Sequence, residues 1–246
     1  MKVYIGLDTG IGKAECEDTA FVNEHLADGA VTEWVCDGLR CIGVADGVGG
    51  NPGGRLASTY AASRIIRADF SGMSEASIRQ FAAELNGDII QYAAGIPGKT
   101  KMATTLTCLV AADDGFYMLH AGNTRLYAMQ GAYLKQLTTD HTTRDWLIQL
   151  GQFEAADRCS GSEINCCFGG GDTRYLDRIV VETLFKDGIP GTLLLSSDGI
   201  HEFVDVDTME QIMHDASGEP EAIRMLMEYA RANGSKDDQT VVIVRR

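Results

Sequence analysis

The sequence predicts an α+β fold in which packed antiparallel sheets are covered by helices. Strand-like segments follow one another in runs that only short turns interrupt, and such connections are typical of antiparallel strands. The helical segments come in pairs between these runs. Runs of strands that alternate with pairs of helices are typical of layered domains in which helices cover a sheet.

The N-terminal part of the chain contains three predicted strands followed by two predicted helices. The strand-like segments are 2–7, 18–23 and 40–45. The first helix, 54–69, is rich in Ala, Ile and Arg. The second helix, 74–94, carries apolar residues at helical spacing, so one face of it is expected to be buried. That face comprises Ile78, Phe81, Ala82, Leu85 and Ile89.

The middle of the chain is predicted to form a four-stranded antiparallel meander. Turn residues such as Gly122-Asn123 and Gln130-Gly131 separate its strands, which lie near 104–111, 115–121, 124–129 and 132–137. A helix is expected at 142–150, and residues 153–175, which include three consecutive glycines, look irregular. The remaining elements are two strands, two helices and a buried final strand, at 177–184, 192–197, 206–215, 219–232 and 240–244.

Length and composition favour one domain, 1–246, because the 246 residues contain no repeat, low-complexity tract or linker. No run of about 18 apolar residues occurs, and the first residues do not resemble a signal peptide, so we expect no membrane association. Acidic residues outnumber basic ones 35 to 21, and the net charge of −14 argues against a nucleic-acid partner. This charge fits either an acidic surface or acids clustered around a metal.

The seven cysteines favour a reducing compartment. Their number is odd and no C-x-x-C pair occurs, so neither a zinc site nor a disulfide framework is indicated. Reduced thiols in a cytoplasmic protein are the simplest interpretation.

Acidic residues stand at the ends of predicted strands in four places, which are Glu17-Asp18, Asp46-Gly47, Asp198-Gly199 and Asp237-Asp238. Each pair alone is better explained as a turn, where Asp and Gly are common. Together they indicate a metal site, because Mg²⁺ and Mn²⁺ prefer carboxylate and carbonyl oxygens. Clustered carboxylates would repel one another unless cations neutralised them. The spacing alone leaves open whether the four places meet.

Seven short motifs, in order along nearly the whole chain, resemble those of the type 2C protein phosphatases, which are metal-dependent Ser/Thr phosphatases. The most specific motif is Val44-Ala45-Asp46-Gly47-Val48-Gly49-Gly50, followed by Gly54 and Ala57-Ser58. The others are Lys13-x-x-Cys16-Glu17-Asp18, Ala103-Thr104-Thr105, Gly122-Asn123-Thr124-Arg125, Leu137-Thr138-Thr139-Asp140-His141-Thr142, Ser196-Ser197-Asp198-Gly199-Ile200 and Asp237-Asp238-Gln239-Thr240. One match would be weak evidence, but seven in order make the chain similar to the bacterial-type catalytic domain of this family.

The resemblance implies a fold and a reaction. The fold is a four-layer sandwich of two antiparallel β-sheets flanked by helices. The reaction is hydrolysis of phosphoserine and phosphothreonine in proteins, by attack of a water that bridges two divalent cations, with no covalent phosphoenzyme. The expected partner is a phosphorylated protein, in opposition to a Ser/Thr kinase, and the chain is expected to be a monomer.

The resemblance also implies roles for individual residues. Asp46 would bridge two ions, Mn²⁺ or Mg²⁺, and the Gly47 carbonyl would bind one of them. The other implied residues are the metal ligands Glu17, Asp198 and Asp237, the water-orienting Asp18, and Lys13, which would grip the substrate phosphate.

Three departures from the family pattern qualify this interpretation. Lys13 stands where an arginine is usual and offers only a point charge, unless it is merely solvated. Asn123 replaces an aspartate that helps to hold a third metal, so we expect a third ion to bind weakly or not at all; alternatively, Asn123 only shapes a turn. Asp238 replaces an asparagine and adds negative charge beside the site.

Two alternatives remain at this level. The departures at Lys13 and Asn123 keep open a catalytically impaired pseudophosphatase that acts as a regulatory binding module. His141 and His201 lie close to motifs, and for both a role in polar packing or capping is a better interpretation than catalysis.

Overall fold

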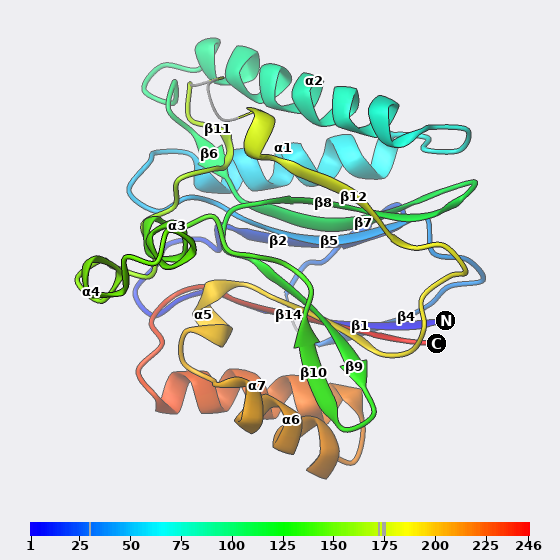
Figure 1. Ribbon diagram of the computed structural model, residues 1–246. Coiled ribbons are helices and arrows are strands. Elements are labelled where there is room, and N and C mark those ends of the chain that lie inside the picture. The colour runs from blue at the N-terminus through cyan, green and yellow to red at the C-terminus, as the bar shows by residue number, and fades with distance from the viewer. Residues whose placement is uncertain (30, 172, 174–175) are drawn as a thin grey trace.

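Two six-stranded antiparallel sheets lie face to face, and helices cover both outer faces (Figure 1). The computed structural model describes residues 1–29, 31–171, 173 and 176–246. This architecture is the four-layer sandwich implied by the motifs, so the predicted fold class is confirmed.

The first sheet joins the two ends of the chain. Its strand order is β10 (Tyr133–Gln136), β9 (Arg125–Gln130), β13 (Leu193–Ser196), β14 (Gln239–Arg245), β1 (Lys2–Asp8) and β4 (Thr32–Val35). The second sheet contains β12 (Val180–Phe185), β8 (Gly115–Ala121), β7 (Leu106–Ala112), β5 (Cys41–Asp46), β2 (Asp18–Val22) and β3 (His25–Leu26). A short pair, β11 (Phe168–Gly169) with β6 (Ala103–Thr104), lies beside the second sheet.

Helices α1 (Gly54–Arg67) and α2 (Glu75–Ala94) cover the second sheet, and α5 (Asp198–His201), α6 (Val206–Asp215) and α7 (Glu219–Ala232) cover the first (Figure 1). Central strands are therefore buried on both faces. In β14, Val242 and Val244 pack between the sheets while Val241 and Ile243 pack under the helices. This double burial explains why the last strand reads as a continuous apolar run.

Close approach of α7 to β1 depends on Gly6. A Cβ at this position would lie 2.3 Å from Cγ2 of Ile223, so any larger residue would push the helix away from the sheet.

The predicted four-stranded meander is wrong, because its strands belong to two sheets. β7 and β8 form a hairpin in the second sheet, whereas β9 and β10 form one in the first. The connection 122–124 crosses from one sheet to the other. A Gly-Asn turn is equally suitable for a hairpin and for such a crossing, so local turn chemistry does not separate the two.

Other elements differ from the prediction mainly at their ends. The predicted strand 177–184 begins as a 3₁₀ turn, Leu176–Arg178, and the strand itself starts at Val180. The segment expected to be irregular, 153–175, contains α4 (Phe153–Ala156) and β11, while positions 172, 174 and 175 of it lie outside the described residues. The short strands β3 and β4 and the short helix α5 were not predicted.

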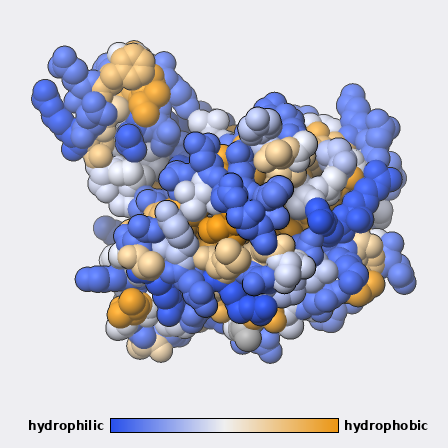
Figure 2. All heavy atoms as spheres, turned by 90° about the horizontal axis from the view of Figure 1, so that it is seen from below, coloured by the Kyte–Doolittle hydropathy of each residue, from blue (hydrophilic) through white to orange (hydrophobic). Residues whose placement is uncertain are grey.

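Helices α3 (Thr143–Gln149) and α4 project from one end of the sandwich (Figure 1). α3 contains no buried residue. Seen from the side of α6 and α7, the surface is mostly hydrophilic, and hydrophobic atoms gather on the lobe at the upper left (Figure 2). The most exposed apolar side chains of this lobe are Trp146, Leu150 and Phe153.

Candidate metal centre

Strand ends from both sheets place the predicted acidic residues at one end of the sandwich. In the second sheet, Asp18 begins β2 and Asp46 ends β5, and the two are direct partners in the strand register. In the first sheet, Asp198 follows β13 and Asp237 precedes β14, which is paired with β13. The four acidic places that the spacing left unconnected are therefore neighbours.

The backbone of Asp46 is held by two threonines of the Ala103-Thr104-Thr105 motif. Its carbonyl oxygen accepts hydrogen bonds from Oγ1 of Thr104, at 2.9 Å, and from the N–H of Thr105, at 2.8 Å. Its own N–H donates to Oγ1 of Thr105, at 3.0 Å. These bonds fix the end of β5 and so the origin of the Asp46 side chain.

Asp18 links the two sheets. Its Oδ2 accepts a hydrogen bond of 2.6 Å from Oγ1 of Thr240 in β14, while its buried Oδ1 has no hydrogen-bond partner among the described residues. Burial raises the pKa of Asp18 to about 7, and the charges of Asp238 and Asp198 also raise it. The hydrogen bond from Thr240 lowers this pKa. A buried carboxylate oxygen without a donor is suited to a cation or a bound water.

Burial and mutual repulsion both raise the carboxyl pKa values of the cluster. Burial raises the pKa of Asp46 well above its usual value, and the charges of Asp18, Asp198 and Asp237 raise it further. The pKa of Asp198 is raised by burial and by the charge of Asp237. The ionised forms of these groups therefore require positive charge nearby.

Glu17 and Gly47 lie against the start of α1. The Glu17 carbonyl oxygen accepts hydrogen bonds from Oγ of Ser58, at 2.6 Å, and from the N–H of Gly47, at 3.2 Å. A Cβ on Gly47 would lie 2.4 Å from the backbone of Gly54, and a Cβ on Gly54 would lie 2.6 Å from Oε1 of Glu17. Glycine at these two positions therefore lets the helix approach both predicted metal-binding residues.

Lys13 is not merely solvated. Its ammonium forms ion pairs with Oδ1 of Asp237 and, at 2.9 Å, with Oδ2 of Asp238. Burial lowers the pKa of Lys13, but its hydrogen bonds to these two carboxylates outweigh burial and raise it above the ordinary value.

Asp238 places negative charge beside the cluster, as expected, and its charge contributes to the raised pKa of Asp18. Its Oδ1 accepts from the N–H of Gly10, at 2.7 Å, and its Oδ2 accepts from the N–H of Glu17, at 2.8 Å. With Lys13 as the third donor, both oxygens of this buried side chain are used within the protein.

Asn123 occupies the sheet-crossing connection and contacts the cluster directly. Its Nδ2 donates to Oδ2 of Asp198, at 2.9 Å, and its buried Oδ1 has no partner among the described residues. The interpretation of Asn123 as a turn residue alone is therefore wrong.

The site offers oxygen ligands with raised carboxyl pKa values. Two of its buried oxygens, on Asp18 and Asn123, have no hydrogen-bond partner among the described residues. These features fit hard divalent cations. Within the described part of the chain, however, no three Asp, Glu, His or Cys side chains converge closely enough to hold one ion as they stand. The Asp237 side chain is paired with Lys13, and the Asp198 side chain accepts a hydrogen bond from Asn123.

Sequence reasoning missed residues that position the site. Arg55 donates from Nη1 to the Asp18 carbonyl oxygen, at 2.7 Å, from the first turn of α1. Ser58 and Thr240 belong to the motifs, but no role was predicted for them. Ser58 donates a hydrogen bond to the Glu17 carbonyl oxygen, and Thr240 donates one to the Asp18 carboxylate. A cation directly after Gly53-Gly54, close to the most specific motif, was the available signal for Arg55.

The two histidines have the packing roles that were expected. His141 accepts a hydrogen bond from the N–H of Gly122 at Nδ1, at 3.2 Å, and packs against His120 with the rings tilted by 37° and their centroids 4.8 Å apart. Nδ1 of His201 is 2.9 Å from Oγ of Ser196. Burial lowers the pKa of His141 to about 4, so the ring accepts as a neutral group.

A polar groove adjoins the cluster on the side of α3. It has a volume of about 480 Å³, and Arg144, Ser160, Ser162 and Glu202 are among the residues that line it.

In the described residues no helix is long and apolar enough to cross a membrane.

Comparisons of the sequence with known proteins identify its family. The model of the family described as protein phosphatase 2C matches residues 21–234. The serine/threonine phosphatase Stp of Listeria monocytogenes is 29% identical over 239 residues, which cover 93% of each chain.

Solved structures show the same fold. The crystal structure of the Mycobacterium tuberculosis phosphatase PstP/Ppp superposes with a TM-score of 0.79 at 24% identity, over 99% of this chain and 98% of that chain. The catalytic domain of PstP in complex with two manganese ions has a TM-score of 0.75 at 23% identity, over the same shares. The family model spans most of the sequence, and the chain belongs to the protein phosphatase 2C family.

Proposed function

We propose that this chain is a metal-dependent protein serine/threonine phosphatase whose metal ligands are Glu17, Asp46, Asp198 and Asp237 with the Gly47 carbonyl. The observation that carries the proposal is the convergence of strand ends from both sheets, which brings Asp46 next to three other carboxylates that all raise its pKa. The family membership and the relatives named as serine/threonine phosphatases support the same reaction.

Two ions, Mn²⁺ or Mg²⁺, would supply an activated water and neutralise charge on the phosphoryl group. The chain would contribute position and charge. Asp46, anchored by Thr104 and Thr105, would lie between the ions, and Asp18, held by Thr240, would orient the attacking water. The Lys13 ammonium, after leaving Asp237, would bind the substrate phosphate.

The substrate class follows from the proposed reaction. We expect a phosphorylated protein, modified by a Ser/Thr kinase, with the phosphate at the carboxylate cluster and the chain acting as one domain and as a monomer. Neither nucleic acid nor a membrane is expected as a partner, given the net charge of −14 and the lack of a membrane-spanning helix among the described residues.

The second candidate is a pseudophosphatase that binds phosphoproteins without turnover. The contacts of Lys13 with Asp237 and of Asn123 with Asp198 favour it, since both engage expected metal ligands. Hydrolysis of a phosphothreonine peptide separates the candidates.

The test uses chelated protein to which Mn²⁺ is then added. A phosphatase loses turnover on chelation and regains it with Mn²⁺, and Asp46→Asn lowers turnover by at least about 100-fold because a charge shared by both ions is lost. Asp187→Asn, the same change at an exposed turn, is the matched control and should leave the rate unchanged. Full turnover after exhaustive chelation contradicts the mechanism, and no turnover at any Mn²⁺ concentration favours the pseudophosphatase.

A further inference from the structure

Lys13 places a positive charge at the edge of the carboxylate cluster. Its ammonium pairs with Asp237, a proposed metal ligand whose side chain is half exposed, and with Asp238, whose side chain is 1% exposed. Its own side chain is 31% exposed, so the amine is sheltered but remains in reach of solvent.

Asp238 is the fixed member of this group. One of its oxygens accepts from Gly10, and the other accepts from Glu17 and Lys13. An asparagine in this position would turn an NH₂ group toward one of these donors, so the full set of three donors requires a carboxylate. Asp238 therefore ties both ends of the Lys13 loop to the start of β14.

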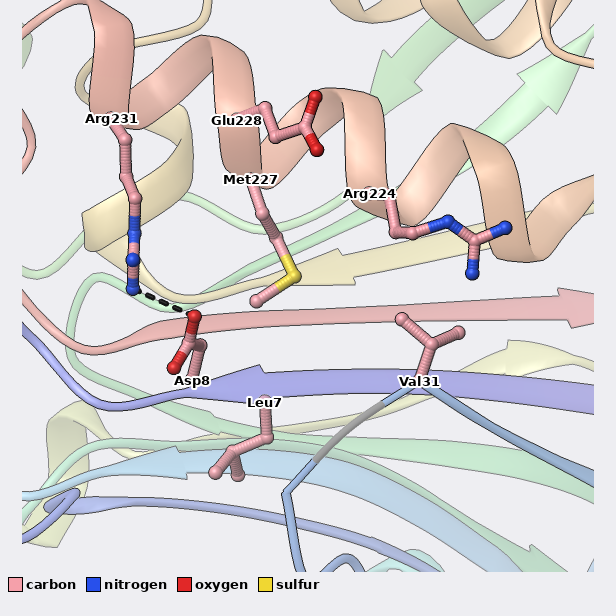
Figure 3. A pocket seen from close by; sticks show the side chains of 7 residues that line it. All are labelled: Leu7, Asp8, Val31, Arg224, Met227, Glu228 and Arg231. Carbon is pink, nitrogen blue, oxygen red and sulfur yellow. Dashed lines mark hydrogen bonds and ion pairs between the residues drawn. The ribbon is translucent and has the colours of Figure 1, made fainter.

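The chain before the loop is also anchored. Nη2 of Arg231 in α7 donates to Oδ2 of Asp8, at 2.7 Å (Figure 3). It also donates to the Thr9 carbonyl oxygen, at 3.2 Å. Within the loop, the N–H of Lys13 donates to the Gly10 carbonyl oxygen, at 3.2 Å. With its backbone restrained in this way, a change of partners by Lys13 would require rotation of its long side chain only.

We propose that Lys13 is a tethered cation that competes with a divalent metal ion for Asp237, and that Asp238 holds Lys13 in place for this competition. Entry of a divalent ion at Asp237 displaces the ammonium, which then faces the position of the substrate phosphate. The displacement by metal rests on the ion pairs described above and on the proposed assignment of Asp237 as a metal ligand, and the last step rests on the proposed phosphatase function. The step exchanges the ammonium ion for the metal ion at Asp237, and no covalent bond is made or broken.

Metal affinity provides the first test. Mn²⁺ binding is measured by titration calorimetry on chelated wild type, Lys13→Met and Lys236→Met. Removal of the competing ammonium should tighten Mn²⁺ binding by about tenfold, because an ammonium in contact with a ligand carboxylate must be displaced. Lys236→Met removes an equal charge one residue before Asp237, from an exposed lysine for which the described residues show no ion pair, and should change affinity by less than about threefold.

Equal effects of the two substitutions would mean that only net charge matters, and would overturn the proposal. Weaker binding by Lys13→Met would overturn it as well, because Lys13 would then support the metal site.

Lysine acylation followed by mass spectrometry gives a readout that needs no variant and no turnover. In the chelated wild type, Lys13 should react more slowly than Lys236, and saturating Mn²⁺ should accelerate the labelling of Lys13 alone. Unchanged labelling of Lys13 upon Mn²⁺ binding contradicts the displacement. A chain that binds Mn²⁺ in this manner but hydrolyses no phosphopeptide would refute the proposed function and leave the competition intact.

Discussion

Asn123 donates a hydrogen bond from its amide to Asp198, so its replacement is expected to act on this proposed metal ligand. An amide offers a cation an oxygen ligand but no negative charge. At the same time its NH₂ group relieves part of the repulsion around Asp198, because the hydrogen bond from Asn123 lowers the pKa of that carboxyl.

Asn123→Asp should lower the stability of the metal-free protein and raise its affinity for metal. Without metal, the new carboxylate faces Asp198 and should lower the melting temperature; with metal, added charge should tighten the weakest ion by about tenfold. Gln91→Glu, the same amide-to-acid change at an exposed position of α2, serves as the control. Metal titration and melting curves of the three proteins check this, and identical curves for wild type and Asn123→Asp would show that position 123 does not act on the metals.

At the scale of elements, α5 is placed by a glycine. A Cβ on Gly199 would lie 1.9 Å from the Asp238 carbonyl oxygen, and the Gly199 carbonyl accepts a hydrogen bond of 2.7 Å from Oγ of Ser235. The start of α5 and the segment before β14 are therefore in direct contact, and this contact sets the distance between Asp198 and Asp237.

Gly199→Ala should destabilise the fold by about 3 kcal/mol, because backbone must move to admit the methyl group. The melting temperature should fall by about 6–12 °C for a chain of this size. Gly191→Ala, at a position with open space around its Cβ, should have little effect. Equal melting temperatures for the two variants would refute the close packing of α5.

His120 in β8 packs against His141, which binds the connection that carries Asn123 through the N–H of Gly122. Nδ1 of His120 lies 2.8 Å from Oγ1 of Thr107, and burial lowers its pKa to about 3, with the charge of His141 acting in the same direction. Burial and the charge of Arg178 lower the pKa of His141 to about 4. Both rings are neutral in the folded state and take up protons on unfolding below pH of about 6.5.

Stability should therefore fall as the pH decreases from about 6.5 toward 4, and His141 should contribute about 2 kcal/mol of this loss. Urea unfolding of wild type and His141→Gln at several pH values measures the contribution, and the variant should show the shallower dependence. His214→Gln, at a side chain that is 80% exposed, should follow the wild type. Parallel curves for all three proteins would exclude His141 as a titrating group in this range.

At the scale of the whole molecule, the carboxylate cluster joins the two sheets. Asp18 and Asp46 belong to the second sheet, while Asp198 and Asp237 flank strands of the first. An ion bound between them should stabilise the packed sheets against unfolding. At a Mn²⁺ concentration of about 100 times the dissociation constant, each site should add about 2.7 kcal/mol, which raises the melting temperature by about 5–10 °C. A melting temperature indifferent to Mn²⁺ and to chelator would show that no ion bridges the sheets.

The sequence was most informative at the strand ends, where the acidic residues of the cluster lie. Asp46, Asp198 and Asp237 could be predicted because each lies in a short motif whose glycine and flanking strand are local features. The hydrogen bonds that hold them could not, because Thr240 and Asp18 are far apart in the chain and meet only when the sheets pack.

Tertiary packing also decided the features that were predicted wrongly. The crossing of the chain at 122–124 depends on which sheet offers a free edge, and no turn signal encodes that. The donors of Asp238, which are two backbone N–H groups and Lys13, were not predicted either. The loop geometry that brings these donors together is absent from any local pattern.

The most direct test of the metal centre is the number of Mn²⁺ ions that the chain binds tightly, measured by equilibrium dialysis with elemental analysis on wild type and Asp46→Asn. The proposed centre predicts two tightly bound ions per chain in the wild type and at most one in the variant, because Asp46 is the ligand proposed to be shared by both. A wild type that binds no Mn²⁺ tightly, or an Asp46→Asn variant that still binds two ions with unchanged affinity, would contradict the proposed metal centre.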